Sequence, residues 1–134
     1  MRRALTAAII LLALVDGLVH LYLGAVLMPG FTHTFFSQLG ILFLLNFLGY
    51  AALSIAFWRA QSSTLSQRRM VGWLLAVYPI VTLIAWVYFT GGKGNPRGTA
   101  YISKPVEILL FVAALLYLRQ LGQENRAPIM ASRS

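Results

Sequence analysis

The chain has 134 residues, of which 59% are hydrophobic and 10% charged, and its mean hydropathy is +0.75. Soluble domains carry about 25% charged residues, so this composition excludes an ordinary water-soluble globule and favours lipid as the solvent. The formal net charge is +8 and no cysteine occurs. Disulfides, thiolate metal sites and cysteine nucleophiles are therefore excluded.

Four segments are long and apolar enough to cross the hydrocarbon layer, which is ~30 Å thick and takes about 20 helical residues. In chain order they cover about residues 4–28, 35–58, 70–89 and 103–121. The first ends at Pro29 and Gly30, because proline cannot continue a helix and glycine suits a C-terminal turn. A polar loop at 59–69 and a glycine-rich loop at 90–100 separate the later spans.

Short connections force consecutive helices to run antiparallel. We therefore predict an all-α fold, an integral membrane four-helix bundle with up-down-up-down topology. The length fits one structural unit, with residues 1–121 forming the membrane domain and 122–134 a short polar cytoplasmic tail that frays.

The basic residues predict how the bundle is oriented. Eight of the eleven fall on one side of the predicted bundle and three on the other. The two groups are Arg2, Arg3, Arg59, Arg68, Arg69, Arg119, Arg126 and Arg133 against Lys93, Arg97 and Lys104. Cytoplasmic flanks of membrane spans carry an excess of such residues, so both termini are expected in the cytoplasm and the chain in the cytoplasmic membrane. Charges placed beside spans face lipid headgroups, so we expect the bilayer, and not nucleic acid, as the partner.

One face of the first predicted span combines small and polar residues at three- and four-residue steps. It consists of Ala13, Asp16, Gly17, His20 and Gly24. Small residues let helices approach closely in lipid. A charge at the bilayer centre costs at least ~2.5 kcal/mol even on lenient scales. This face is therefore expected to turn toward the bundle interior.

The other spans offer partners for these polar groups. Asn46 lies in the middle of the second span. A stripe along the fourth span is predicted to contain Lys104, Glu107, Phe111, Ala114 and Leu118. We expect His20 to face Glu107, Asp16 and Asn46 to lie deeper, and Lys104 to close the outer mouth of the cluster.

Two interpretations of this cluster stay open. It is either a polar clamp that fixes helix pairing, or a binding site for a proton, an ion or a ligand, since intramembrane ionisable residues are commonly functional. Glu107 has a further interpretation, because Ser103 or Lys104 could cap a helix with Pro105 in its first turn and an acid that complements the dipole. Asp16 is either ionised beside an opposite charge or protonated as a hydrogen-bond donor.

The sequence predicts no cofactor and no metal. A haem with two axial histidines needs two facing imidazoles, and one of the two histidines, His33, falls in a predicted outer loop, away from His20. Zinc would need more ligands than Asp16, His20 and Glu107 comfortably supply, but these three residues stay open as a zinc-ligand set.

No serine–histidine–acid set with plausible catalytic geometry occurs, so we expect no catalytic activity. The predicted function is an accessory or interaction subunit, or a membrane-embedded binding module, with a membrane-protein partner or a second copy of itself. The alternative is a small oligomeric transporter that couples to a proton, an ion or a solute through the same cluster. A sealed cluster would favour the first function, and a water-accessible one the second.

Overall fold

The computed structural model describes residues 2–27, 35–90 and 100–131, and all of them but a short connection are helical. The helices are α1 (Arg2–Leu27), α2 (Phe35–Ala60), α3 (Leu65–Thr90) and α4 (Ala100–Ala131). Each is long and apolar enough to cross a membrane. The predicted all-α architecture of four spanning-length helices is confirmed at this level.

The connection between α2 and α3 is shorter than the predicted polar loop at 59–69. It leaves only residues 61–64 outside the helices. The backbone N–H of Thr64 donates to Oε1 of Gln67 at 3.3 Å, and the backbone N–H of Gln67 donates to Oγ1 of Thr64 at 3.4 Å. This reciprocal capping box starts a helix, which explains why α3 begins at Leu65 and not near residue 70.

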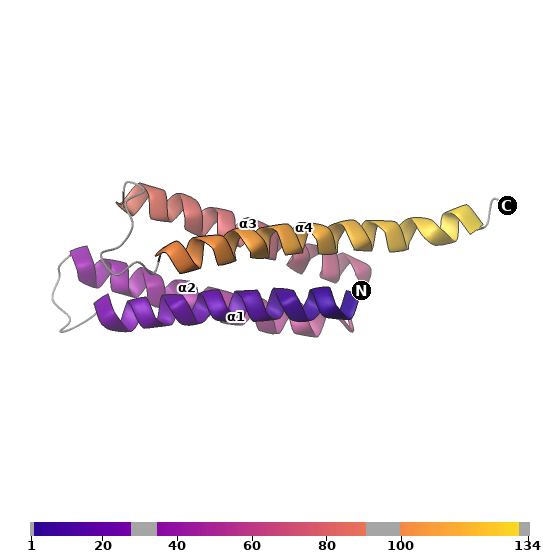
Figure 1. The fold of residues 1–134 in the computed structure, drawn as a ribbon. Helices are drawn as coiled ribbons and strands as arrows, with labels where there is room; N and C mark the ends of the chain where they lie inside the picture. The colour runs from indigo at the N-terminus through magenta and orange to yellow at the C-terminus, as the bar shows by residue number, and fades with distance from the viewer. Residues whose placement is uncertain (1, 28–34, 91–99, 132–134) are drawn as a thin grey trace.

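Helix α4 is longer at both ends than the predicted span at 103–121. It begins at Ala100, so Ser103 and Pro105 lie inside the helix and do not form its cap. At the other end it continues through residues 122–131, where a frayed tail was expected. Adding residues to an existing helix costs far less than starting one. In Figure 1 this end of α4 projects beyond the other three helices.

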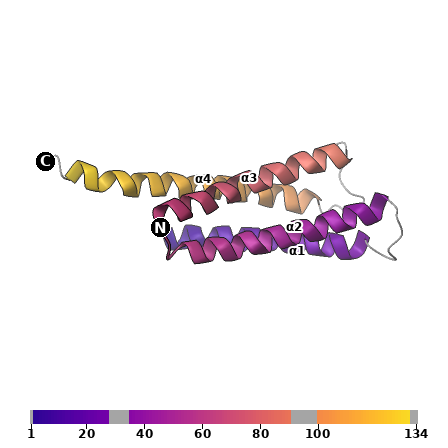
Figure 2. The same ribbon diagram turned by 180° about the vertical axis from the view of Figure 1, so that it is seen from behind.

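The four helices form a ring in which consecutive helices run antiparallel (Figure 1). Helix α1 packs against α2 and α4, and α3 packs against α4 and α2. Within the described residues the backbones of the two diagonal pairs do not approach one another, but the rings of Phe57 on α2 and Tyr117 on α4 pack edge-on with their centres 4.8 Å apart. The view from behind in Figure 2 shows that the start of α1 and the end of α4 lie at the same end of the bundle.

The predicted inward face of α1 is confirmed. Asp16 and His20 are 0% and 2% exposed, and the small residues of the same face are buried with them. A Cβ placed on Gly24 would lie 2.8 Å from the Leu44 side chain, and one on Gly17 would lie 3.3 Å from Tyr50. These glycines therefore set the close approach of α1 to α2.

The predicted stripe on α4 was wrong by about one residue. Lys104, Phe111 and Leu118 are only partly buried. The buried residues of α4 are Ser103, Glu107, Leu110, Ala113, Ala114, Tyr117 and Leu121. This buried stripe faces α1 and α3. From Leu110 to Leu121 it joins an apolar core whose largest side chains include Tyr50, Tyr117 and Phe57.

Large apolar side chains also cover the outside of the bundle. Examples on all four helices are Leu11, Leu18, Leu45, Leu48, Ile84 and Ile108, each more than half exposed. Water would penalise such a surface, whereas hydrocarbon does not. Together with the length of the helices, it indicates a multi-pass membrane protein.

Candidate functional site: a buried polar cluster between α1 and α4

A cluster of polar side chains lies between α1 and α4. Asp16 and His20 come from α1, and Ser103 and Glu107 from α4; all four are at most 2% exposed. Each pair is separated by four residues, so both members project from the same face of their helix. With Lys104 at its edge, this set is called the buried cluster below.

The orientation of the His20 ring is fixed by its own helix. Nδ1 lies 2.8 Å from the backbone carbonyl oxygen of Asp16. A carbonyl only accepts hydrogen bonds, so Nδ1 carries a proton. Nε2 then points across to α4, 3.8 Å from Oε1 of Glu107. In the neutral ring Nε2 is a lone-pair acceptor, and it faces another acceptor.

The two oxygens of Asp16 have different surroundings. The Ser103 hydroxyl donates to Oδ1 at 2.8 Å, which joins the two helices. Oδ2 is buried and, within the described part of the chain, has no hydrogen-bond partner. The Tyr50 hydroxyl makes a long donor interaction with the Asp16 carboxylate, outside ordinary hydrogen-bond geometry, and it lies 3.5 Å from Oγ1 of Thr82.

Glu107 is paired with a lysine on its own helix. Nζ of Lys104 lies 2.7 Å from both Oε1 and Oε2. The Lys104 side chain is 15% exposed, whereas that of Glu107 is 2% exposed. The ammonium also lies 5.6 Å from the centre of the Trp86 ring, a cation–π contact with α3. Lys104 therefore occupies the edge of the cluster, as predicted.

Aromatic side chains from α2 and α3 cover the cluster. The His20 ring centre lies 5.5 Å from that of Phe43 and 5.9 Å from that of Tyr50. Tyr78 packs edge-on against Tyr50 at 4.8 Å. This wall keeps the surroundings of the charged groups apolar, which strengthens their mutual electrostatic interactions.

Asp16, His20 and Glu107 each offer one atom that could bind a metal, and these atoms all lie within 4.8 Å of one another. The set contains an imidazole nitrogen and two carboxylate oxygens, which are ligands for first-row divalent cations. Haem ligation would need a second imidazole, and His33 lies outside the described residues.

Comparisons with known proteins do not identify the chain. It matches no protein-family model, no curated protein and no solved structure. The geometry of the site therefore carries the functional argument alone.

Four of the five predicted site residues meet in the cluster, and the expected pairing of His20 with Glu107 is present. Asp16 contacts Ser103 and lies in one group with His20 and Glu107. That it lies deeper, beside Asn46, stays a prediction. Asn46 is half-buried, and its backbone carbonyl accepts a hydrogen bond from the Tyr78 hydroxyl at 3.4 Å.

Ser103 and Tyr50 were missed by the sequence analysis. Ser103 precedes Glu107 by four residues, so the shared face was visible in the spacing. The sequence analysis took Ser103 for a possible helix cap, because it placed the start of α4 three residues too late. Tyr50 gives no such signal, since a tyrosine in an apolar span fits both core and lipid positions.

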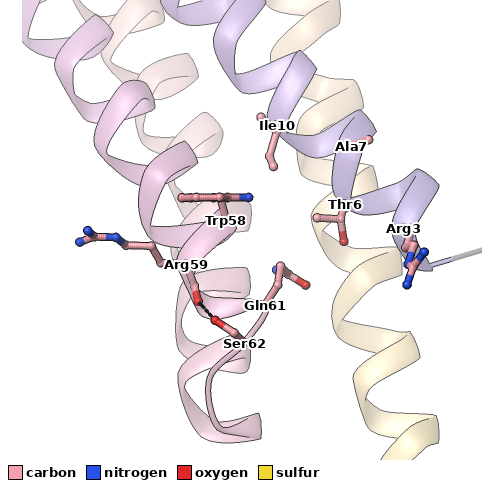
Figure 3. A pocket seen from close by; sticks show the side chains of 8 residues that line it. All are labelled: Arg3, Thr6, Ala7, Ile10, Trp58, Arg59, Gln61 and Ser62. Atoms are coloured by element: carbon pink, nitrogen blue, oxygen red, sulfur yellow. Dashed lines mark hydrogen bonds between the residues drawn. The ribbon is translucent and has the colours of Figure 1, made fainter.

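A separate groove lies at the other end of the bundle, between the start of α1 and the end of α2 (Figure 3). It has a volume of about 670 Å³ and includes no residue of the buried cluster. Its lining consists of Arg3, Thr6, Ala7, Ile10, Trp58, Arg59, Gln61 and Ser62. In Figure 3 the Arg59 side chain extends away from α1, while the Arg59 carbonyl accepts from the Ser62 hydroxyl at 3.1 Å.

Proposed function

We propose that this chain is a non-catalytic subunit of the cytoplasmic membrane, with both termini in the cytoplasm, that presents its apolar helix faces to a membrane-protein partner or to a second copy. The buried cluster fastens α1 to α4 and so fixes the shape of those faces. The observation that carries the proposal is the burial of the cluster: Asp16, His20, Ser103 and Glu107 are at most 2% exposed.

Burial at this level separates the proposal from a carrier. A substrate-carrying cluster must exchange its cargo with water in each cycle, whereas a clamp functions best when water is kept away. Here aromatic rings of Phe43 and Tyr50 pack on His20, and the one partly exposed charge, Lys104, is already paired with Glu107. Close packing that keeps water away from these groups is what a clamp requires.

The charge distribution supports the orientation. Arg3 at the start of α1 and Arg59 at the end of α2 lie at one end of the bundle. Arg68 and Arg69, in the first turns of α3, lie at that end too. An end of the bundle rich in arginine is the one that stays in the cytoplasm.

The rival function is a small oligomeric transporter. The observation that favours it is the unpartnered Oδ2 of Asp16, because an unsatisfied buried acceptor can take up a proton or an ion. This function requires the aromatic wall to open in each cycle, so flux measurements separate it from the proposal.

The test compares His20→Ala and Glu107→Gln with the unaltered protein. In detergent, both variants are expected to melt at a lower temperature. His20→Ala leaves a cavity beside the Phe43 and Tyr50 rings, and Glu107→Gln removes the carboxylate that pairs with the Lys104 ammonium. Reconstituted vesicles of the unaltered protein are expected to show no proton or ion flux above empty vesicles. Flux that the two variants abolish without loss of thermal stability would overturn the proposal in favour of the transporter.

The matched control is Ser54→Ala. Ser54 is also buried and polar, but it donates only to the Tyr50 carbonyl in its own helix, at 2.8 Å. Its loss should change the melting temperature less than either cluster variant. Cross-linking in native membranes, followed by mild solubilisation, should retain a second protein or a second copy on the unaltered chain. A chain that remains a monomer without any partner contradicts the subunit function.

A further inference from the structure

The buried cluster contains more hydrogen-bond acceptors than donors. Oδ2 of Asp16 is buried and has no partner within the described residues. Nε2 of His20, unprotonated in the neutral ring because Nδ1 donates to the Asp16 carbonyl, faces Oε1 of Glu107 at 3.8 Å. Acceptors that face one another in an apolar site are stabilised by a cation between them.

The charges lead to the same conclusion. Asp16 and Glu107 carry two negative charges when ionised, and Lys104 supplies one positive charge. With both carboxylates ionised and His20 neutral, the cluster keeps one uncompensated negative charge inside an apolar wall. Such a charge is costly in the low dielectric of a bundle interior unless it is neutralised.

We propose that Oδ2 of Asp16, Nε2 of His20 and Oε1 of Glu107 bind one first-row divalent metal ion, with Zn²⁺ as the best match. One ligand atom from each of the three residues already lies within 4.8 Å of the other two. Nε2 of His20 is 3.8 Å from Oε1 of Glu107, and Oδ2 of Asp16 is 3.7 Å from Nδ1 of His20. One imidazole and two carboxylates make up a three-ligand set of the kind found in zinc sites that keep a fourth position open. Mg²⁺ and Ca²⁺ prefer six or more oxygen ligands, which these residues do not supply.

The residues around the three donors have the arrangement of supporting groups in metal sites. A metal-binding histidine usually donates its other ring N–H to a carbonyl or a carboxylate, and metal-binding carboxylates accept hydrogen bonds from neighbours. Here Nδ1 of His20 donates to the Asp16 carbonyl at 2.8 Å. The Ser103 hydroxyl donates to Oδ1 of Asp16, also at 2.8 Å, and leaves Oδ2 for the metal.

Lys104 is the competing cation. Its ammonium contacts both oxygens of Glu107 at 2.7 Å, so a metal at Oε1 must displace it. The side chain is the most exposed of the cluster, at 15%, and a lysine stem can carry its ammonium to the membrane surface. The bound metal then replaces a single positive charge by a double one, and the two carboxylates are fully neutralised.

The experiment measures Zn²⁺ binding to the full-length chain in detergent, without a polyhistidine tag, by calorimetry and by metal content after dialysis. One Zn²⁺ per chain is expected. Asp16→Asn and His20→Phe should each weaken binding at least a hundredfold, whereas His33→Ala and Ser54→Ala should not change it. Mg²⁺ at the same concentration should not compete.

Lys104→Gln keeps the test decisive if the ligand variants do not fold. It removes the competitor and no ligand, so it should bind Zn²⁺ at least tenfold more tightly. Ser103→Ala should weaken binding about 10–100-fold, the usual effect of losing a supporting hydrogen bond. No stoichiometric Zn²⁺ on the unaltered chain overturns the proposal, as does equal affinity of the unaltered chain, Asp16→Asn and Lys104→Gln.

The metal site is independent of the proposed subunit function. Flux and partner capture test the function, whereas the binding constants test the site. Absent Zn²⁺ binding with a captured partner overturns only the site, and Zn²⁺ flux into vesicles overturns only the function.

Discussion

At the scale of single residues, Asp16 accounts for most of the unusual chemistry of this protein. One of its oxygens accepts from Ser103 on the facing helix, while the other is buried and has no hydrogen-bond partner among the residues that the structure describes. Its backbone carbonyl also orients His20. A single acid thus joins α1 to α4, positions an imidazole and leaves an acceptor free for a ligand.

This arrangement predicts opposite effects for two substitutions of Asp16 in the metal-free protein. Asp16→Asn should leave stability unchanged or raise it, because the amide oxygen can still accept from Ser103 while the amide carries no charge and replaces the unpartnered acceptor Oδ2 by a donor. Asp16→Ala should lower stability by about 1–3 kcal/mol, the cost of unsatisfied buried polar groups. Denaturation in a mixed-micelle titration measures both. Equal losses for the two variants would contradict the assignment of Oδ2 as an unpartnered acceptor.

At the scale of helices, glycines set how closely neighbours approach. A Cβ on Gly24 would lie 2.8 Å from Leu44 and 3.2 Å from the backbone oxygen of Gly40. A Cβ on Gly49 would overlap the Tyr78 hydroxyl, and one on Gly72 would lie 2.9 Å from Leu118. Each of these glycines thus lies at a contact between two helices, where small residues pack best in lipid.

Gly24→Val is therefore expected to separate α1 from α2. The backbone oxygen of Gly40 cannot move aside as a side chain can, so we expect a loss of about 1–3 kcal/mol, typical of overpacking. Gly122→Ala is the control, because a Cβ there meets nothing within 4 Å. Since alanine favours a helix over glycine by ~1 kcal/mol, the control should be neutral or stabilising. Thermal unfolding in detergent distinguishes the two, and a stable Gly24→Val protein would contradict the close approach.

The start of α3 offers a second prediction for helices. Thr64→Ala removes the hydroxyl that accepts from the Gln67 N–H and contacts its side chain at 3.3 Å. Loss of such a cap costs about 0.5–2 kcal/mol. Hydrogen exchange at residues 65–68 should accelerate, while exchange in α1 stays unchanged. Thr64→Ser, which retains the hydroxyl, should restore protection.

The properties of single helices also explain which parts of the candidate site could be predicted from the sequence. The inward face of α1 was found because Asp16 and His20 mark it with polar groups and Gly17 and Gly24 mark it with small residues. Helix α4 has fewer such markers, and in lipid both its inner and outer faces are apolar, so hydrophobic periodicity does not fix the rotation of the helix. Hence Lys104 was placed on the buried stripe and Ser103 was not. Asn46 was assigned by depth alone, which does not determine its direction.

At the scale of the whole molecule, the positive charge is gathered at one end. The groove of Figure 3 opens at that end, between Arg3 on α1 and Gln61 after α2. The buried cluster lies in the other half, where α4 begins. The spans were predicted from hydropathy because length and composition decide whether a helix can cross a membrane. Contacts between distant segments, such as Asp16 with Ser103, depend on the register of packed helices, which no local pattern contains.

This polarity makes the orientation testable, because the chain has no cysteine of its own. Ser62→Cys, in the exposed connection between α2 and α3, should react with a membrane-impermeant maleimide only after the cells are opened. Gly92→Cys, in the segment that joins α3 to α4, should react in intact cells. The physical reason is that Arg59, Arg68 and Arg69 flank the connection between α2 and α3, and arginine-rich flanks are retained in the cytoplasm.

The reverse labelling pattern would place the arginine-rich end outside. In that case, changing these three arginines to glutamine should have no effect on orientation. If the arginines do determine it, the same triple change should produce a mixture of both labelling patterns.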